Sequence, residues 1–406
     1  MLRYHAALVS RTCPSCGTSY PDEVFFCEED DQVVIQDQAP DDFDQRLGRE
    51  LAGYRLAARV ADGSNGRVYE GLHPETRMRV AIKVLHAEVA CDRVAVERLR
   101  REYESAAEMN HPHIVKVLGY GDTGDGSHYM VMEFLEGQEL SQALEGGPLP
   151  LARVVRIVMQ VALALDYAHS FGFIHRDLKP ANIFLCDSAH GPSIRILDFG
   201  SVKLQMESSS KLTALGTTLG SPYYMSPEQA MGAGDVDQRT DVFALGSILY
   251  EMLTNQVAFE GESIPHILSR IIEEEPDAPS TVHQNCPAGL DPVVAQALAK
   301  DKGQRFGSAV ELANGMVLAL GLTGEAERWA NESEFSIVRA LAGATPPVPR
   351  SFRGRLKFGQ GQLGGLPPLP PFPPVPQLLQ RRPLPLWLSV VVGLAITGTA
   401  LMYFIR

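Results

Sequence analysis

The spacing of hydrophobic positions changes along the chain. Short runs rich in β-branched and aromatic residues come first, such as RVAIKVL (79–85) and HYMVMEFL (128–135), and they predict strands. Longer runs come later, and in LARVVRIVMQVALALDYAHS (151–170) apolar residues recur at helical spacing, which predicts a helix with a buried face. Strands early and helices late favour an α+β fold for residues 54–320.

The segments on either side of this region differ from it in composition. Residues 1–36 carry three closely spaced cysteines, and the acidic residues 37–53 that follow are predicted to be a solvated linker. Residues 321–385 are predicted to be a second linker, rich in proline, glycine and basic side chains. Its stretch GLPPLPPFPPVP is incompatible with a helix or a central strand.

The final run, residues 386–405, contains no charged residue and has about the length that crosses a hydrocarbon core. Trp387 and Tyr403 stand near its ends, and Arg381 and Arg382 precede it, as is typical of a membrane-spanning helix with its basic flank in the cytoplasm. We therefore expect a single-pass protein of the cell membrane whose main body is cytoplasmic. A buried helix of a soluble domain is the alternative.

Charge narrows the range of partners. The formal net charge is −13, which argues against a general nucleic-acid binder, because such a protein needs clustered Lys and Arg. The six cysteines suggest no disulfide framework, and the chain begins with no signal peptide, so free or metal-bound thiols are expected.

The N-terminal cysteines have the spacing of a zinc-ribbon-like site. Zinc prefers four tetrahedral ligands. The expected ligands are Cys13, Cys16, Cys27 and Asp30. Asp31 and His5 are rivals for the fourth place, and a flexible segment without metal is the alternative. A metal would supply the folding energy that so short a segment lacks, and the expected role of the module is structural or partner-binding.

Five short motifs lie in order within residues 54–320. They are the glycine loop VADGSNGRV (60–68), VAIK (80–83), HRDLKPAN (175–182), DFG (198–200) and SPE (226–228). The first is weak alone, since a glycine-bearing hairpin needs no ligand. A lysine facing inward from an apolar strand requires an anionic partner, which makes Lys83 more informative.

Together the motifs resemble the eukaryotic-type (Hanks-type) serine/threonine protein kinase family, including its bacterial branch. The resemblance covers roughly residues 54–320. It implies a bilobal fold with a β-rich N-lobe and an α-rich C-lobe, with ATP and Mg²⁺ as cofactors. It also implies transfer of the γ-phosphate to Ser or Thr hydroxyls of protein substrates.

The resemblance assigns the central roles. Asp177 would accept or orient the proton of the attacking hydroxyl, and Lys179 would lie beside the γ-phosphate, which argues against a tyrosine kinase. Asn182 and Asp198 would ligate Mg²⁺ through oxygen. Lys83 would contact the α and β phosphates and pair with a helical glutamate. The family position gives that glutamate as Glu102, with Glu97 and Glu104 as competitors.

The resemblance also assigns supporting roles. The residues expected around the nucleotide are Val60, Gly63, Gly66, Val68, Lys83, Glu133 and Leu135, and the stretch 132–135 would lie along the adenine. Arg176 is expected to pair with a phosphate on the activation loop, with Thr213, Thr217 and Thr218 as candidate autophosphorylation sites. The expected structural residues are Glu228, Asp241 and Arg305.

Two features depart from the family pattern. Ala61 replaces the first loop glycine, and Ser221 stands where threonine is usual. Ala61 is the only support for the alternative function, a membrane-tethered pseudokinase scaffold that recruits protein partners through the cysteine module and the proline-rich linker. A small-molecule phosphotransferase is disfavoured by the SPE motif and the long loop before it.

Overall fold

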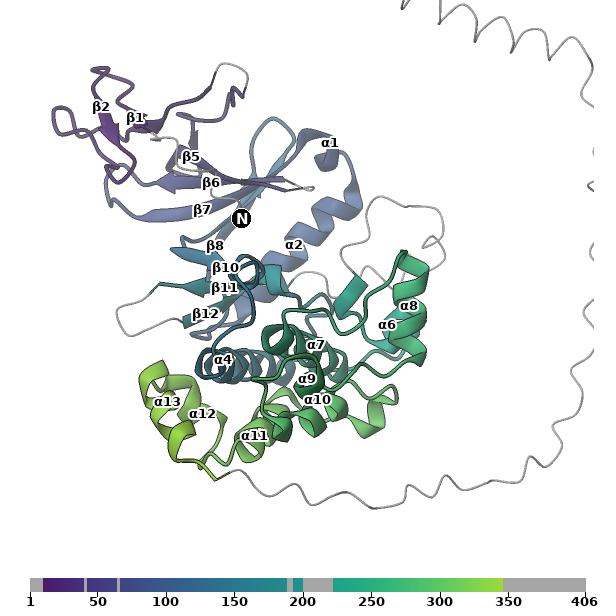
Figure 1. Ribbon diagram of the computed structural model, residues 1–406. Coiled ribbons are helices and arrows are strands. Elements are labelled where there is room, and N and C mark those ends of the chain that lie inside the picture. Colours follow the sequence, from purple (N-terminus) through teal and green to yellow (C-terminus); the bar gives the residue numbers. More distant parts are fainter. Residues whose placement is uncertain (1–9, 40–41, 64–65, 188–192, 200–221, 346–406) are drawn as a thin grey trace, which may run out of the picture. The chain divides into compact units, whose positions relative to one another are not determined.

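The structure of the protein is a computed structural model that describes residues 10–39, 42–63, 66–187, 193–199 and 222–345. Strands gather in the first half of this part of the chain and helices in the second (Figure 1). The bilobal α+β arrangement expected from the sequence is therefore confirmed.

The N-lobe is built on a six-stranded antiparallel sheet of order β4-β5-β6-β7-β9-β8. Its strands are β4 (Glu50–Leu51), β5 (Tyr54–Asp62), β6 (Gly66–Leu72), β7 (Arg79–Leu85), β8 (Val117–Asp122) and β9 (His128–Glu133). Two helices, α1 (Ala87–Ala90) and α2 (Arg93–Glu108), connect β7 to β8. Asp92 caps α2, because its side chain accepts a hydrogen bond from the backbone N–H of Val94.

Both faces of this sheet are covered. On one face Tyr69, Ile82 and Val131 form a buried cluster against which Leu47 and Leu51 pack. Lys83 projects from the opposite face, since alternate residues of a strand point to opposite sides. There α2 packs its Leu99 against Leu85 and Met130.

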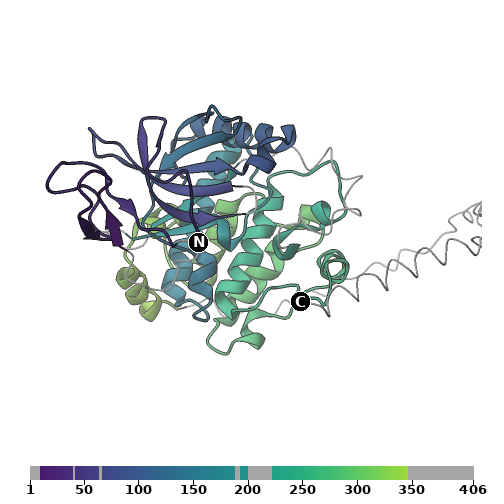
Figure 2. The same ribbon diagram turned by 90° about the horizontal axis from the view of Figure 1, so that it is seen from above.

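The cysteine module forms a small sheet of its own, of order β2-β1-β3. Its strands are β1 (Ser10–Thr12), β2 (Ser19–Pro21) and β3 (Ile35–Gln36). In both views the module, coloured dark purple, lies at one side of the N-lobe strands (Figures 1 and 2).

The C-lobe combines a small sheet of order β10-β11-β12 with packed helices. The strands are β10 (Gly137–Glu139), β11 (Ile183–Cys186) and β12 (Ser193–Ile196). The α-helices are α3 (Leu140–Leu144), α4 (Leu151–Ser170), α6 (Pro227–Ala230), α7 (Arg239–Thr254), α8 (Ile264–Glu273), α9 (Pro279–Val282), α10 (Asp291–Ala297), α11 (Ala309–Ala319), α12 (Ala326–Asn331) and α13 (Glu334–Gly343). Short 3₁₀ turns are Pro180–Asn182, Pro222–Tyr224, Ala288–Leu290 and Lys302–Gln304.

Helix α4 lies at the centre of the C-lobe. Val154, Val158 and Leu165 are fully buried, as the helical spacing predicted, and α7, α11, α12 and α13 pack around the helix. A helix buried on most of its circumference removes almost all of its apolar surface from water, and this burial stabilises the lobe.

The second linker begins later than predicted. Residues 326–343 form α12 and α13, which pack on α4 and are not part of an extended segment. Trp329 and Ile337 are buried at 2% and 0% exposure, and the side chain of Gln160 donates to the carbonyl of Ala330 at 2.8 Å. Proline-rich composition starts only after Ala344, so the boundary at residue 321 was wrong.

The acidic linker is also less solvated than predicted. Asp44 is buried and accepts a hydrogen bond from the hydroxyl of Tyr69 at 2.7 Å, and Arg67 lies 3.1 Å from the same carboxylate. Opposite charge on the lobe draws this part of the linker onto the sheet, because a carboxylate tolerates burial when it is paired.

The predicted membrane segment 386–405, and the linker beyond residue 345, lie outside the described residues. Within the described ranges, no helix is both long enough and apolar enough to cross a bilayer. The membrane anchor therefore remains a prediction.

Candidate active site

The HRDLKPAN segment runs from the end of α4 to the start of β11, and Asp241 of α7 fixes its backbone. The fully buried carboxylate of Asp241 accepts the N–H groups of His175 and Arg176 at 2.8 and 2.9 Å, and the ring of His169 at 2.7 Å. Burial alone would raise the pKa of Asp241, but these hydrogen bonds and charges hold it below its usual value. Arg176 has a positive φ of 63°, and the contacts with Asp241 stabilise this uncommon conformation.

The next residues bring three polar side chains together. The carboxylate of Asp177 accepts a hydrogen bond from Nζ of Lys179 at 2.8 Å, and both side chains are partly exposed. Asn182 is buried and donates through Nδ2 to the carbonyl of Asp177 at 2.7 Å. The Lys179 cation thus orients the carboxylate of Asp177, and the side chain of Asn182 holds the backbone carbonyl of the same residue.

Lys83 on β7 lies between two carboxylates from distant parts of the chain. Its Nζ is 3.0 Å from Glu102 of α2 and 3.1 Å from Asp198 of the DFG motif. Glu97 and Glu104 instead pair with Arg100 on the exposed side of α2, which leaves Glu102 as the helical partner of Lys83. Phe199 is buried, with its ring centroid 4.8 Å from that of His175.

Lys83, Glu102 and Asp198 shift one another's pKa values. Burial would lower the pKa of Lys83, but Asp198 and Glu102 outweigh it and raise that pKa. Burial and the charge of Asp198 raise the pKa of Glu102 to about 8, against the opposing effect of Lys83. Burial also opposes ionisation of Asp198, yet Lys83 keeps the pKa of Asp198 well below its usual value. Asp198 is therefore the carboxylate that stays ionised, and it is an oxygen ligand suited to Mg²⁺.

The glycine loop joins β5 to β6. The N–H of Gly63 donates to the carbonyl of Gly66 at 3.0 Å, and residues 64–65 between them lie outside the described residues. A Cβ at Gly66 would stand 2.3 Å from the carbonyl oxygen of Val84, so the strand pairing requires glycine there. Ala61, by contrast, pairs with Val68 as an ordinary strand residue, and Val60 precedes it at an irregularity of the same strand.

The strand register places Val68 beside Lys83, on the same face of the sheet. Glu133 ends β9, where its side chain accepts from the N–H of Lys116 at 2.8 Å and from Arg195 at 3.1 Å. Leu135 follows and is half-buried. The residues expected along the adenine therefore lie at the end of a strand next to β7.

The SPE motif opens α6, which Ser226 caps. Glu228 forms a two-pronged ion pair with Arg305, with both N–O distances at 2.8 Å and the arginine side chain fully buried. Nε of Arg176 is buried and has no hydrogen-bond partner among the described residues. The candidate phosphorylation sites Thr213, Thr217 and Thr218 lie outside them.

Sequence reasoning missed two residues that hold the catalytic segment. His169 contacts Asp241 from the end of α4, and Gln229 donates to the carbonyl of Arg176 at 2.6 Å. The only sequence signal for His169 was its place beside the apolar face of a helix that is predicted to be buried, where a polar side chain needs a partner. Gln229 gave no signal, because its role depends on where α6 packs.

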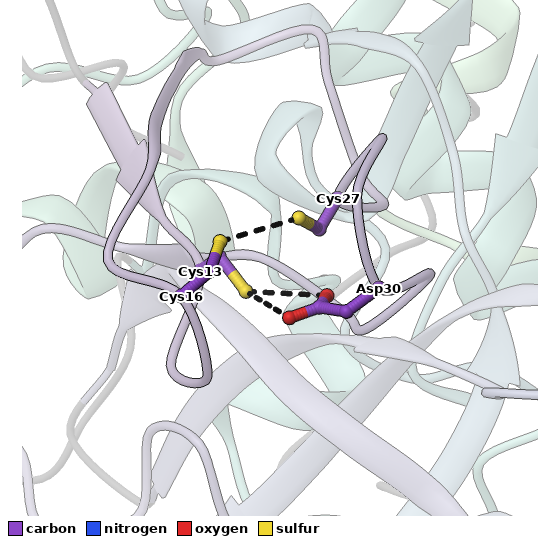
Figure 3. Close-up of side chains that lie close together, drawn as sticks. All are labelled: Cys13, Cys16, Cys27 and Asp30. Atoms are coloured by element: carbon purple, nitrogen blue, oxygen red, sulfur yellow. Dashed lines mark hydrogen bonds between the residues drawn. The ribbon is translucent and has the colours of Figure 1, made fainter.

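The cysteine module brings its four candidate ligands together (Figure 3). Their ligand atoms all lie within 4.8 Å of one another. The sulfurs of Cys16 and Cys27 are 3.6 Å apart, and the sulfur of Cys13 lies 3.3 Å from Asp30. A tetrahedral zinc ion with Zn–S bonds of about 2.3 Å places its sulfur ligands roughly 3.8 Å apart. The donor set therefore fits zinc in type and in spacing.

Two rivals for the fourth position fare differently. The carboxylate of Asp31 instead pairs with Arg77, which lies between β6 and β7, and both side chains are exposed. His5 lies outside the described residues. Asp30 is thus the carboxylate that accompanies the thiols in the described part of the chain.

Residues 54–315 match the family described as the protein kinase domain. The serine/threonine-protein kinase pkn3 of Myxococcus xanthus is 37% identical over 276 residues, covering 66% of this chain and 50% of the relative. The serine/threonine-protein kinase pkn2 of the same organism is 36% identical over 272 residues, covering 66% and 32%. The chain thus spans a third to a half of the length of these relatives.

A solved structure gives the same answer for the fold. The kinase domain of PknI from Mycobacterium tuberculosis is 32% identical, with a TM-score of 0.53, covering 67% of this chain and 98% of that one. The chain belongs to the protein kinase domain family, in its bacterial Hanks-type serine/threonine branch.

Proposed function

We propose that this protein transfers the γ-phosphate of ATP to serine or threonine hydroxyls of protein substrates. The observation that carries the proposal is the pair of contacts from Lys83, to Glu102 at 3.0 Å and to Asp198 at 3.1 Å. A lysine held by a helix and by the DFG motif at once is positioned for the phosphates of a nucleotide. A pseudokinase would have no need to keep all of these groups in place.

The residues around Asp177 supply the acceptor side of the reaction. Its carboxylate can orient a substrate hydroxyl and accept the hydroxyl's proton as the bond to phosphorus forms. Lys179 lies 2.8 Å from that carboxylate, where its charge can also stabilise negative charge on the transferred group. Both side chains are partly exposed, as access by a protein substrate requires.

Mg²⁺ would be held by Asp198 and Asn182. The amide nitrogen of Asn182 is committed to the carbonyl of Asp177, so its oxygen is the atom offered to a metal. Two hard oxygen donors with room for phosphate and water match the preference of this ion. When bound, Mg²⁺ neutralises charge on the phosphates.

The test uses the full-length chain with Mg²⁺ and labelled ATP. We expect phosphorylation of the chain itself or of a basic carrier protein, and we expect Asp177→Asn to abolish it while nucleotide binding persists in calorimetry. Equal silence of both proteins, with nucleotide bound, would leave the pseudokinase scaffold as the function. Absence of nucleotide binding would refute the kinase activity.

Regulation by autophosphorylation is part of the proposal. The buried Nε of Arg176 has no hydrogen-bond partner among the described residues, and a phosphate would provide one. We expect mass spectrometry of the active enzyme to find phosphate on Thr213, Thr217 or Thr218, and not in Asp177→Asn. Phosphate confined to other segments would contradict this role.

The membrane anchor rests on the uncharged run 386–405 and its basic flank. We expect the full chain to sediment with membranes and a chain ending at residue 380 not to do so. Recovery of the full chain in the soluble fraction would remove the anchor from the proposal.

Zinc in the cysteine module is supported by the geometry of Cys13, Cys16, Cys27 and Asp30. We expect about one zinc per purified chain by elemental analysis, and a loss of it in Cys16→Ser. Cys91→Ser is the matched control, since Cys91 is an exposed cysteine outside the module. Equal zinc content in all three proteins would refute the site.

A further inference from the structure

The cysteine module lies on the same face of the N-lobe sheet as Lys83. The register pairs Val68 with Lys83, Glu70 with Ala81 and Leu72 with Arg79. Residues two apart on a strand point the same way, so Glu70, Leu72 and Arg79 share the face from which Lys83 projects. Helix α2 covers one end of that face, and the module covers the other.

The contact between module and lobe has an apolar centre. Val33 of the module packs with Ala57 of β5 and Leu72 of β6, and all three are at most 2% exposed. Phe25 and Phe26 pack at the edge of this cluster. Burial to this degree is typical of a permanent interface within a domain.

Beside this centre lies a chain of buried charges. Arg11 of β1 contacts Glu70 of β6, with Nη1 and Oε2 2.8 Å apart and side-chain exposures of 4% and 1%. Arg79 pairs with the other oxygen of Glu70. A single glutamate is thus shared by a cation from the module and a cation from the kinase. Removing either cation would leave the buried carboxylate of Glu70 with a single cationic partner.

Arg79 links the module to the segment expected along the adenine. Its guanidinium lies over two aromatic rings, 4.5 Å from the centre of Phe25 in the module and 3.8 Å from the centre of Phe134. It also contacts Glu136 at 2.5 Å. Phe134 belongs to the stretch 132–135 at the end of β9, which is the segment expected along the adenine. The module therefore reaches this segment through one side chain.

The residues through which the module contacts the lobe alternate along the sequence with its candidate metal ligands. Arg11 precedes Cys13, Phe25 and Phe26 precede Cys27, and Val33 follows Asp30. The module's own buried cluster consists of Cys13, Cys27 and Val34. So small a core cannot hold the backbone by hydrophobic burial alone, and the positions of Arg11 and Phe25 depend on what ties the thiols together.

We propose that the metal-bound cysteine module is a brace for the nucleotide cleft, so that Zn²⁺ in the module strengthens ATP binding through Arg11, Glu70 and Arg79. The proposal rests on the zinc site and the nucleotide site proposed above. It gives the module a role within the catalytic unit, whereas a recruiting module would leave nucleotide affinity unaffected by zinc.

The experiment measures the Kd for Mg-ADP by calorimetry in the full-length chain, together with zinc content. Zinc is removed with a chelator and then restored, which avoids dependence on any variant. We expect removal to weaken nucleotide binding by about 5-fold or more, and restoration to recover it. Hydrogen exchange should rise in residues 79–85 and 128–135 when zinc is absent.

Two variants separate the metal from its path to the cleft. Arg11→Met should keep zinc, because Arg11 is not a ligand, and should still weaken nucleotide binding by about 5-fold. Arg77→Asn is the matched control, since Arg77 also contacts the module, through Asp31 and the ring of Phe26, but from an exposed position and without a contact to Glu70 or Arg79. Asparagine tolerates the positive φ of 58° at that residue. This control should bind zinc and nucleotide normally.

Unchanged nucleotide affinity after verified loss of zinc would overturn the brace, as would wild-type affinity in Arg11→Met. Failure to bind zinc at all would also overturn it. None of these results touches the proposed kinase activity, which is decided by the comparison with Asp177→Asn.

Discussion

The buried ion pair between Glu228 and Arg305 gives a quantitative test of how the C-lobe is held together. Arg305 is fully buried and contacts Glu228 through both terminal nitrogens at 2.8 Å. It also donates to the carbonyls of Ala299 at 2.8 Å and Lys300 at 3.2 Å. The perturbation is Arg305→Met, which keeps the length of the side chain and removes all of these donors.

The expected loss follows from what remains after the substitution. Removing one partner of a buried ion pair costs about 3–5 kcal/mol, because the other charge stays buried without compensation. For a unit of this size, 1 kcal/mol lowers Tm by roughly 2–4 °C. The variant should therefore melt about 6–20 °C below the parent protein. The loss should also loosen α6, which carries Glu228 next to the catalytic segment.

The pH dependence has a definite sign. Burial would raise the pKa of Glu228, but Arg305 outweighs it and holds that pKa below its usual value. A depressed carboxyl pKa stabilises the fold above the unfolded pKa of about 4.3, and the contribution is lost as pH falls through the folded pKa. In Arg305→Met the unpaired Glu228 has a raised pKa, so the variant recovers stability when that group becomes protonated. The difference between the two proteins should thus shrink from pH 7 to pH 5.

Urea and thermal unfolding of the full chain at pH 7 measure the difference. Arg100→Gln is the control, since its pairs with Glu97 and Glu104 are exposed and are worth less than about 1 kcal/mol. The double variant Glu228→Leu with Arg305→Met should lose less than Arg305→Met alone. If Arg305→Met is no less stable than Arg100→Gln, the ion pair does not hold the lobe together.

Three further predictions concern the site and its support. Glu102→Gln should lower kcat/KM by roughly 10- to 100-fold, because Lys83 loses an anchor. Since the pKa of Glu102 is raised to about 8, the nucleotide-free parent should lose stability as pH rises from about 4.5 to 8, and thermal scans of the variant should show a flatter dependence. Gly137→Ala should cost about 1–3 kcal/mol in urea unfolding, because φ is +137° and a Cβ would stand 2.0 Å from the carbonyl of Leu185, whereas Gly119→Ala, with open space, should cost far less. Leu165→Ala in α4 should cost about 2–5 kcal/mol by the same assay, since the side chain is fully buried.

The sequence alone determined the chemistry of the site. Each catalytic group sits in a short motif whose residue types are set by the reaction, and Asp177, Lys179 and Asn182 are close in space because they are close in the chain. The helix at 151–170 was equally accessible, because its apolar spacing reflects burial directly. The choice of Glu102 over its neighbours came from resemblance, and the structure supplies the reason, since only Glu102 points toward Lys83 while Glu97 and Glu104 meet Arg100.

Only the tertiary structure decided how distant segments meet. Residues 326–343 look like the start of a linker until α4 offers their apolar side chains a surface. Glu70 and Arg79 look like ordinary strand residues until Arg11 and Phe25 arrive from the cysteine module. The physical reason is the same in both cases. A local pattern records which face of an element is buried, whereas the partner that buries it depends on long-range packing that no spacing along the chain encodes.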